Sequence, residues 1–326
     1  MADGSLLVTP DDVARASRRV AGRLHRTPML TSRTLGEAFG GTALLKAELF
    51  QRTGSFKPRG LLARLAGLDA DARAKGVVTV SAGNAAAALA YGAALEGVDC
   101  LVCMWQGASP HKVAATQAYG ATVDQDAASP EEAFARVQEI AEETGRTFVH
   151  PFDDHDVIAG HGSLGYELVE DAPDVDVVVV PVGGGGLVSG VTVAVKDARP
   201  EARVVAVEPE GSAALHAALL AGRPVKVVPT SIADGLNAPF AGRRCVAVTR
   251  EHDVETVLVT EDEIRAGFRF LYGRAKLAVE PAAAAAAGAL LAGRIGGLEG
   301  RTVVSVVSGG NVSARMASDI LASHEA

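Results

Sequence analysis

Cysteine is scarce in this sequence, because three residues among 326 are too few for a disulfide framework. Cys100 and Cys103 form a CxxC pattern, but they lie in the apolar run CLVCMW, and residues three apart on a strand point to opposite faces. We therefore expect packed core thiols rather than a zinc site or a redox pair. The eight histidines follow no metal-ligand spacing, and His150, His155 and His161 are predicted to be polar loop residues.

Positive charge is also in short supply, with 31 Lys and Arg against 39 Asp and Glu and a formal net charge of -8. Nucleic acids and anionic membrane surfaces need clustered cations, so a small-molecule ligand is favoured over either partner. The N-terminal stretch MADGSLLVTPDDV has no basic start followed by an apolar core, so we predict no secretory signal and a cytoplasmic protein. The uncharged residues 177–195 are interrupted by Pro181 and four glycines, which favours a buried strand, turn and helix over a membrane span.

Short valine-rich runs alternate with alanine-rich helical stretches along most of the chain. The clearest strand candidates are VVTVS, VDCLVCMW, VDVVVVPV, RVVAVEP and TVVSVVS. Such alternation is typical of a parallel sheet with helices on both faces, so the predicted fold class is α/β. The length and the 48% hydrophobic content are sufficient for a large core and two lobes. The segment PAAAAAAGALLAG, which begins at Pro281, is predicted to be a buried helix.

Three glycine-containing loops follow predicted strands. Residues 183–186 are four consecutive glycines between a strand and a helix, an arrangement that offers backbone N–H groups to an anion, most often phosphate. Residues 81–84 and 308–311 repeat the pattern with Ser, Gly and Asn. Ligands of open parallel sheets bind outside the carboxyl ends of the strands, so all three loops are expected to face one crevice. A dinucleotide site stays an alternative, because Glu208 stands about where a ribose-binding acid would.

Lys57 lies in the stretch FQRTGSFKPRG at the start of a predicted helix. Ser55 is a candidate cap, Pro58 suits the first helical position, and leucines follow at helical spacing. The positive end of a helix favours the neutral amine, which is the nucleophilic form. The alternative is a solvated surface lysine.

The chain resembles the fold type II pyridoxal phosphate enzymes, and within them the serine/threonine dehydratase group, which includes threonine ammonia-lyases and serine racemases. The stretches that carry the resemblance are LLKAELFQRTGSFKPRG, VSAGNAAAALAY, HPFDDHDVIAGHGS, VPVGGGGLVSG, VEP, SIADGL, VEPAAA and SGGN. They occur in the family's order and cover nearly the whole chain. The resemblance implies a two-lobed α/β fold like that of tryptophan synthase β, in which each lobe is an open, mostly parallel sheet flanked by helices. It implies a large cofactor-binding domain of residues 1–72 and 153–326 and a small domain of residues 73–152.

The resemblance also implies pyridoxal 5'-phosphate as the cofactor and a role for each matching residue. Lys57 would form the Schiff base, Phe56 would pack beside the cofactor, Asn84 would bond its ring hydroxyl, and Ser308 would face its pyridine nitrogen. The phosphate would be cradled by Gly183, Gly184, Gly185, Gly186 and Leu187. The substrate carboxylate would be held by Ser81, Ala82, Gly83, Asn84 and Ala85.

The implied reaction is the dehydration and deamination of a β-hydroxy amino acid, with Lys57 as the general base and a 2-oxo acid and ammonia as products. Ala82 replaces the serine that racemases of this group use, so racemisation is expected to be poor. Ala85 replaces the family's usual histidine, which suggests room for a bulky β-substituent such as a phenyl ring. Some members bind a cation through the glutamate of the VEP motif, which Glu208 matches here, and through an aspartate a few residues later. Ala214 stands at the aspartate position, so no metal is predicted. A homodimer is the family habit.

Three alternatives to this lyase reading stay open at the level of sequence. The first is another reaction of the same cofactor family, such as that of threonine synthase or an amino acid racemase. The second is a nucleotide-binding oxidoreductase built around the loop of residues 183–186 and Glu208, which leaves Lys57, Asn84 and Ser308 unexplained. The third is a binding protein without activity, against which the presence of Lys57 argues.

Overall fold

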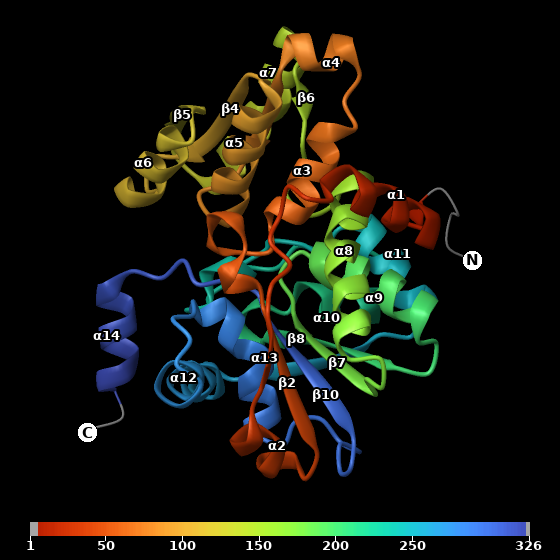
Figure 1. Cartoon of the computed structure of the whole chain (residues 1–326). Helices are drawn as coiled ribbons and strands as arrows, with labels where there is room; N and C mark the ends of the chain where they lie inside the picture. The colour runs from red at the N-terminus through yellow and green to blue at the C-terminus, as the bar shows by residue number, and fades with distance from the viewer. Residues whose placement is uncertain (1–5, 324–326) are drawn as a thin grey trace.

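The computed structural model describes residues 6–323 as two lobes, each built on its own sheet (Figure 1). Residues 1–5 and 324–326 lie outside the described residues. They are the two ends of the predicted large domain, and residues 1–5 also begin the N-terminal stretch in which no secretory signal is predicted. The lower lobe in Figure 1 holds a six-stranded sheet and the upper lobe a four-stranded one. The predicted α/β class is confirmed.

The six-stranded sheet has the order β1-β2-β10-β7-β8-β9. Its strands are β1 (Met29–Thr31), β2 (Thr42–Ala47), β7 (Val177–Pro181), β8 (Arg203–Pro209), β9 (Glu255–Val259) and β10 (Thr302–Val307). Only the β1–β2 pair is antiparallel, and in the central strand β10 Val304 stands beside Leu44 on one side and Val178 on the other. The valine runs are buried on both faces, which explains why they are continuous rather than alternating.

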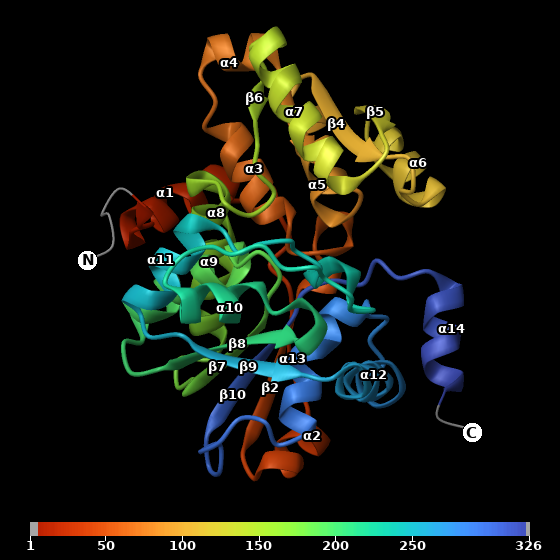
Figure 2. The same ribbon diagram turned by 180° about the vertical axis from the view of Figure 1, so that it is seen from behind.

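Helices cover both faces of this sheet. One face packs against α2 (Arg33–Phe39), α12 (Glu261–Arg269) and α13 (Pro281–Leu291), and the other against α8 (His155–Asp171), α9 (Gly186–Ala198) and α10 (Ala214–Ala221). The other helices of this lobe are α1 (Pro10–Val20), α3 (Pro58–Ala66), α11 (Arg243–Glu251) and α14 (Ala314–Ala322), and Figure 2 shows the same layers from behind. Shorter elements are the 3-10 turns Glu48–Phe50, Arg52–Gly54, Glu210–Ser212 and Asp234–Leu236 and a π-helical turn, Phe270–Arg274.

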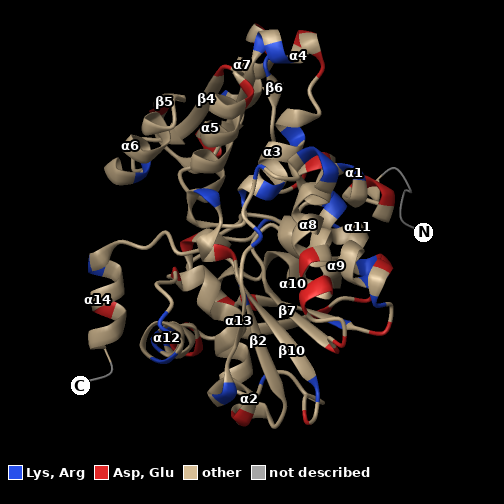
Figure 3. Cartoon of the chain, viewed as in Figure 1, with Lys and Arg blue, Asp and Glu red and all other residues tan. Residues whose placement is uncertain are grey.

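The alanine-rich helix α13 is buried along its length, as predicted. It has no charged residue, and Figure 3 accordingly shows this helix in tan. Alanine favours the helix, and its small side chain lets α13 lie close to the neighbouring helix α12. The two backbones are so close at Gly288 that an added Cβ would lie 2.4 Å from the Glu263 carbonyl oxygen of α12. None of the helices in residues 6–323 combines the length and the apolar character that crossing a membrane requires.

The four-stranded sheet is entirely parallel and has the order β5-β4-β3-β6. Its strands are β3 (Val77–Val80), β4 (Cys100–Trp105), β5 (Thr122–Ala127) and β6 (Thr147–Phe148), and its helices are α4 (Ala70–Lys75), α5 (Asn84–Glu96), α6 (Pro110–Ala118) and α7 (Pro130–Thr144). Cys100 and Cys103 are buried on opposite faces of β4, in two different core clusters. The prediction of packed core thiols is therefore confirmed.

Candidate active site

Lys57 lies where the two lobes meet, directly before the first residue of α3. Its Nζ donates a hydrogen bond to the Pro151 carbonyl oxygen at 2.9 Å and stands 5.1 Å from the centre of the Phe56 ring. The predicted place at a helix start is confirmed, and the alternative of a solvated surface lysine is wrong. Ser55 does not cap α3, because it is buried and pairs through its backbone with Gly309.

The amine of Lys57 is shifted toward its neutral form. Burial lowers its pKa from 10.5 to about 8, while the nearby Cys245 and Glu280 act in the opposite direction. The sequence reasoning attributed this effect to the helix start, but removal from water is the largest cause. An amine with this pKa has a neutral, nucleophilic fraction near physiological pH.

Phe56 joins Lys57 to two other parts of the molecule. Its backbone N–H donates to the Ser308 carbonyl oxygen at 3.0 Å, and its ring meets the His161 ring edge-on at 4.8 Å. His161 was predicted to be a polar loop residue, but it lies in α8 and is fully buried. Neither of its ring nitrogens has a hydrogen-bond partner within residues 6–323. Burial, followed by the charges of Lys57 and Arg59, holds its pKa well below the usual value, so the ring is neutral.

The Asn84 side chain connects two of the predicted loops. Its Nδ2 donates to both carboxylate oxygens of Glu280, at 2.9 and 3.1 Å, and its Oδ1 accepts from Asn311 Nδ2 at 2.7 Å. Loops at residues 81–84 and 308–311 therefore meet at one place, as the sequence predicts for a shared crevice. Because each lobe supplies one of these loops, Asn84 also ties the lobes to each other.

Glu280 is a site residue that the sequence reasoning missed. It is 4% exposed, and burial raises the pKa of its carboxyl to about 7, an effect that the bond from Asn84 partly offsets. Its position carried a signal, because it is a single carboxylate directly before Pro281 and a run of alanines that has no other polar group. A charge placed there must be buried with the helix, and buried charges need a partner or a function.

The four glycines form a tight cradle between β7 and α9. A Cβ added at Gly184 would lie 2.4 Å from the Phe152 ring, and one at Gly185 would lie 2.7 Å from Cys245 Cβ. Gly185 also has φ +93°, a conformation that side chains disfavour. Gly186 and Leu187 begin α9, where backbone N–H groups have no partner inside the helix and offer bonds to an anion. The sequence prediction of a strand, turn and helix is confirmed here.

Residues 81–83 link β3 to α5, and Asn84 and Ala85 are the first residues of α5. Gly83 donates its N–H to Ser81 Oγ at 3.2 Å, which turns the chain before Asn84. Ala85 is 4% exposed and packs in the core of the small lobe. In the other lobe, Ser308 follows β10 and is also buried.

Glu208 does not face a ligand. Its two carboxylate oxygens accept the backbone N–H groups of Leu215 and His216 at 2.7 and 2.8 Å, so it caps the first turn of α10. The dinucleotide alternative needs this carboxylate free for a ribose hydroxyl, and the structure therefore contradicts it.

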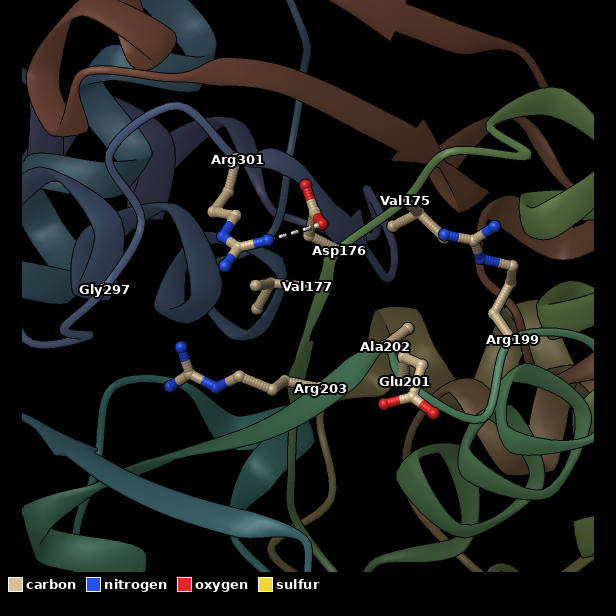
Figure 4. A pocket seen from close by; sticks show the side chains of 9 residues that line it. All are labelled: Val175, Asp176, Val177, Arg199, Glu201, Ala202, Arg203, Gly297 and Arg301. Carbon is tan, nitrogen blue, oxygen red and sulfur yellow. Dashed lines mark hydrogen bonds and ion pairs between the residues drawn. The ribbon is translucent and has the colours of Figure 1, made fainter.

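A hollow of about 270 Å³ lies at the amino-terminal ends of inner strands of the six-stranded sheet (Figure 4). It is lined by residues at the amino ends of β7 and β8, among them Asp176 and Arg203. Arg301 pairs with Asp176 across it at 3.1 Å, drawn as a dashed line in Figure 4. Arg203 pairs with Glu255 at 2.6 Å. Because ligands of such sheets bind at the carboxyl ends of the strands, we place the active site at Lys57 and not at this hollow.

Comparisons with known proteins agree with the predicted fold and the predicted cofactor. The family described as "Pyridoxal-phosphate dependent enzyme" matches residues 20–309. The chain is 41% identical to the catabolic L-threonine dehydratase of Escherichia coli over 97% of this chain and 96% of that protein. It is 43% identical to a phenylserine dehydratase of Ralstonia pickettii over 89% of each chain. The crystal structure of serine racemase from Dictyostelium discoideum matches with a TM-score of 0.88 and 36% identity, covering 94% of this chain and 99% of that one.

The residues present fit the cofactor that this family is named for. A half-buried amine suits its aldehyde, and a cradle of glycines at a helix start suits its phosphate. The predicted cofactor and the predicted fold are thereby confirmed. The chain belongs to the pyridoxal-phosphate dependent enzymes of fold type II, and within them to the serine/threonine dehydratase group.

Proposed function

We propose that this enzyme is an ammonia-lyase that dehydrates and deaminates a β-hydroxy amino acid, giving a 2-oxo acid and ammonia. The water released in the elimination is balanced by the water consumed when ammonia is released. The observation that carries the proposal is the Lys57 amine, which is half-buried, has a pKa of about 8 and stands at the junction of the two lobes. The relatives named as threonine and phenylserine dehydratases support it.

In this proposal Lys57 has two tasks. It would hold the cofactor through the aldehyde, and its Nζ, once free, would take the proton from the substrate Cα. The bound cofactor supplies the electron withdrawal that makes this proton acidic. The Pro151 carbonyl oxygen, 2.9 Å from Nζ, keeps the amine oriented.

We assign the other roles as the sequence analysis expected them. Residues 183–187 would hold the phosphate, Phe56 would pack beside the cofactor, Asn84 would bond the ring hydroxyl, and residues 81–85 would hold the substrate carboxylate. Ser308 would face the pyridine nitrogen. A neutral serine there would hold no ring proton as a carboxylate would, which would favour prompt loss of the β-hydroxyl.

Racemisation is the second candidate, because a serine racemase matches this chain closely in structure. Ala82 counts against it, since a methyl group cannot donate or accept a proton at the second face of Cα. Chiral analysis of recovered L-serine after incubation separates the two reactions.

The test of the lyase proposal is the release of ammonia and 2-oxo acid from L-serine, L-threonine and L-threo-3-phenylserine by the cofactor-loaded enzyme. We expect release from at least one of them, and loss of more than a thousandfold in rate in Lys57→Ala. Lys75→Ala is the matched control, because Lys75 forms a surface ion pair with Asp71 and should leave the rate unchanged. Absence of release from all three, with the yellow cofactor bound, would refute the proposal.

Three further assignments belong to this proposal. We divide the chain into a large domain of residues 1–72 and 153–326 and a small domain of residues 73–152, a division supported by the two separate sheets. We infer a homodimer, to be tested by light scattering on the purified enzyme. We also infer a cytoplasmic location, which three buried free cysteines suit because reduced thiols persist there.

A further inference from the structure

Five rings gather where the two lobes meet, and we call them the aromatic cluster: Phe134, Phe148, His150, Phe152 and Phe240. The His150 and Phe152 rings are 4.5 Å apart, Phe152 and Phe240 5.5 Å, and Phe134 stands 6.0 Å from Phe240. Each of these contacts is edge-to-face, the geometry that aromatic rings prefer. The sequence has only nine phenylalanines, so four of them at one place mark a local need for aromatic surface.

Both lobes contribute to the cluster. Phe134 lies on α7 and Phe148 ends β6, in the upper lobe of Figure 2, while Phe240 lies shortly before α11 in the lower lobe. All five rings are only half-buried, so part of each remains accessible. Fully buried rings would serve the core alone, whereas rings that stay partly accessible can accept a further apolar group.

The cluster touches the reactive centre at two points. Pro151, between His150 and Phe152, supplies the carbonyl oxygen that accepts the Lys57 hydrogen bond at 2.9 Å. The Phe152 ring packs on Gly184 of the glycine cradle so closely that an added Cβ would lie 2.4 Å away. A group carried on the substrate Cβ is only three bonds from the amine nitrogen that exchanges with Lys57, so we place this group against the surface of the cluster.

The cluster is also uncharged. His150 Nδ1 accepts the backbone N–H groups of Phe152 and Asp153 at 3.3 and 3.0 Å, which leaves its hydrogen on Nε2. Burial lowers its pKa to about 4, with the charge of Lys57 acting in the same direction and Asp153 against it, so the ring is neutral at pH 7. A surface of this kind suits an apolar side chain and disfavours a carboxylate.

We propose that the aromatic cluster is the subsite for the substrate's β-substituent, and that the enzyme prefers β-hydroxy amino acids with an aryl group on Cβ over those with hydrogen or methyl. This inference rests on the proposed lyase function and specifies its substrate class. The sequence analysis predicts room for a bulky group at Ala85, and the aromatic cluster is a further apolar surface close to Lys57, linked to it through Pro151.

The first test compares kcat/KM for L-threo-3-phenylserine and L-threonine. Because a phenyl ring buries far more apolar area than a methyl group, we expect the ratio to exceed ten in the unaltered enzyme. Phe134→Ala should lower kcat/KM for phenylserine about tenfold and change that for threonine less than threefold. Phe50→Ala is the matched control, because Phe50 is 49% exposed and lies outside the cluster, so the ratio should stay the same.

A second test does not depend on elimination. L-Phenylalanine lacks the β-hydroxyl, and calorimetric titration of the holoenzyme should show it binding at least tenfold more tightly than L-alanine, with this preference reduced in Phe134→Ala. If Phe134→Ala fails to fold, Phe134→Leu keeps an apolar side chain without the ring and should lower both preferences in the same direction.

The outcomes separate the inference from the function on which it rests. Release of 2-oxo acid from threonine and serine with no advantage for phenylserine, or an unchanged ratio in the Phe134 variants, would overturn the aryl subsite and leave the lyase intact. Tight, Phe134-dependent binding of L-phenylalanine without release of 2-oxo acid from any substrate would support the subsite and reject the lyase.

Discussion

Replacing Lys57 by methionine should stabilise the cofactor-free protein at neutral pH. Methionine keeps most of the length of the side chain and removes the amine. The lysine is half-buried, and its pKa falls from 10.5 to about 8 because its charged form loses water. At pH 7 the ammonium form therefore costs the folded state up to about 3 kcal/mol, at about 1.4 kcal/mol for each pKa unit.

The sign and the pH window follow from proton linkage. Between pH 8 and 10.5 the unfolded chain binds this proton more tightly than the folded chain does, so the wild-type protein gains stability as the pH rises. Below pH 8 the cost is present in full. The advantage of Lys57→Met over the wild type should therefore shrink by roughly 2.5 kcal/mol between pH 7 and pH 10.

The assay is urea denaturation of both cofactor-free proteins at pH 7 and pH 10, followed by circular dichroism. Comparison of the two proteins at each pH cancels the titration of all other groups. A difference in the free energy of unfolding that is the same at both pH values would refute the reasoning, because it would show that the amine keeps its ordinary pKa. Lys75→Met serves as the control, since an exposed lysine in a surface ion pair should show little change with pH in this range.

Two further perturbations follow from buried charges. Burial raises the Glu280 pKa from 4.5 to about 7, so the folded state holds this proton more tightly, and the free energy of unfolding should fall by about 3 kcal/mol as the pH rises through that window. Glu280→Gln should lose this component, and a pH slope equal to that of the wild type in urea denaturation would contradict it. Arg59 is 1% exposed and donates hydrogen bonds to Glu48 and Glu167. Arg59→Met should lower the free energy of unfolding by about 3–5 kcal/mol, because the buried Glu48 carboxylate would lose its ion-pair partner. Thermal denaturation measures this, and a loss no larger than that of the exposed Arg301→Met would count against it.

Local patterns in the sequence were sufficient for most of the architecture. Valine runs predict buried parallel strands because both faces of such strands are covered, and the run at β7 followed by glycines and α9 is found as expected. Lys57 was placed correctly at the start of α3 because Pro58 and the leucine spacing are local signals. The family motifs, read in order, also identified the cofactor.

Contacts between distant segments were decided by the tertiary structure alone. Glu280 meets Asn84 across 196 positions of the chain, and no local pattern shows that a carboxylate will be buried beside an amide. His161 follows the same rule, since a polar residue near glycine and aspartate looks like a loop residue until the packing of α8 against α3 buries it. His150 does lie in a loop, as predicted.

The sequence by itself determined the fold class and the place of Lys57 at a helix start, because periodicity and local signals encode them within a few residues. Its resemblance to a known family supplied the cofactor. Only the tertiary structure decided why the lysine is partly neutral, since burial depends on both lobes closing around it. Only the tertiary structure brought Phe134 and Phe240 to within 6.0 Å of each other. Rings that are 106 positions apart meet because the two lobes pack against each other, and this packing depends on the complementarity of complete surfaces rather than on any single stretch.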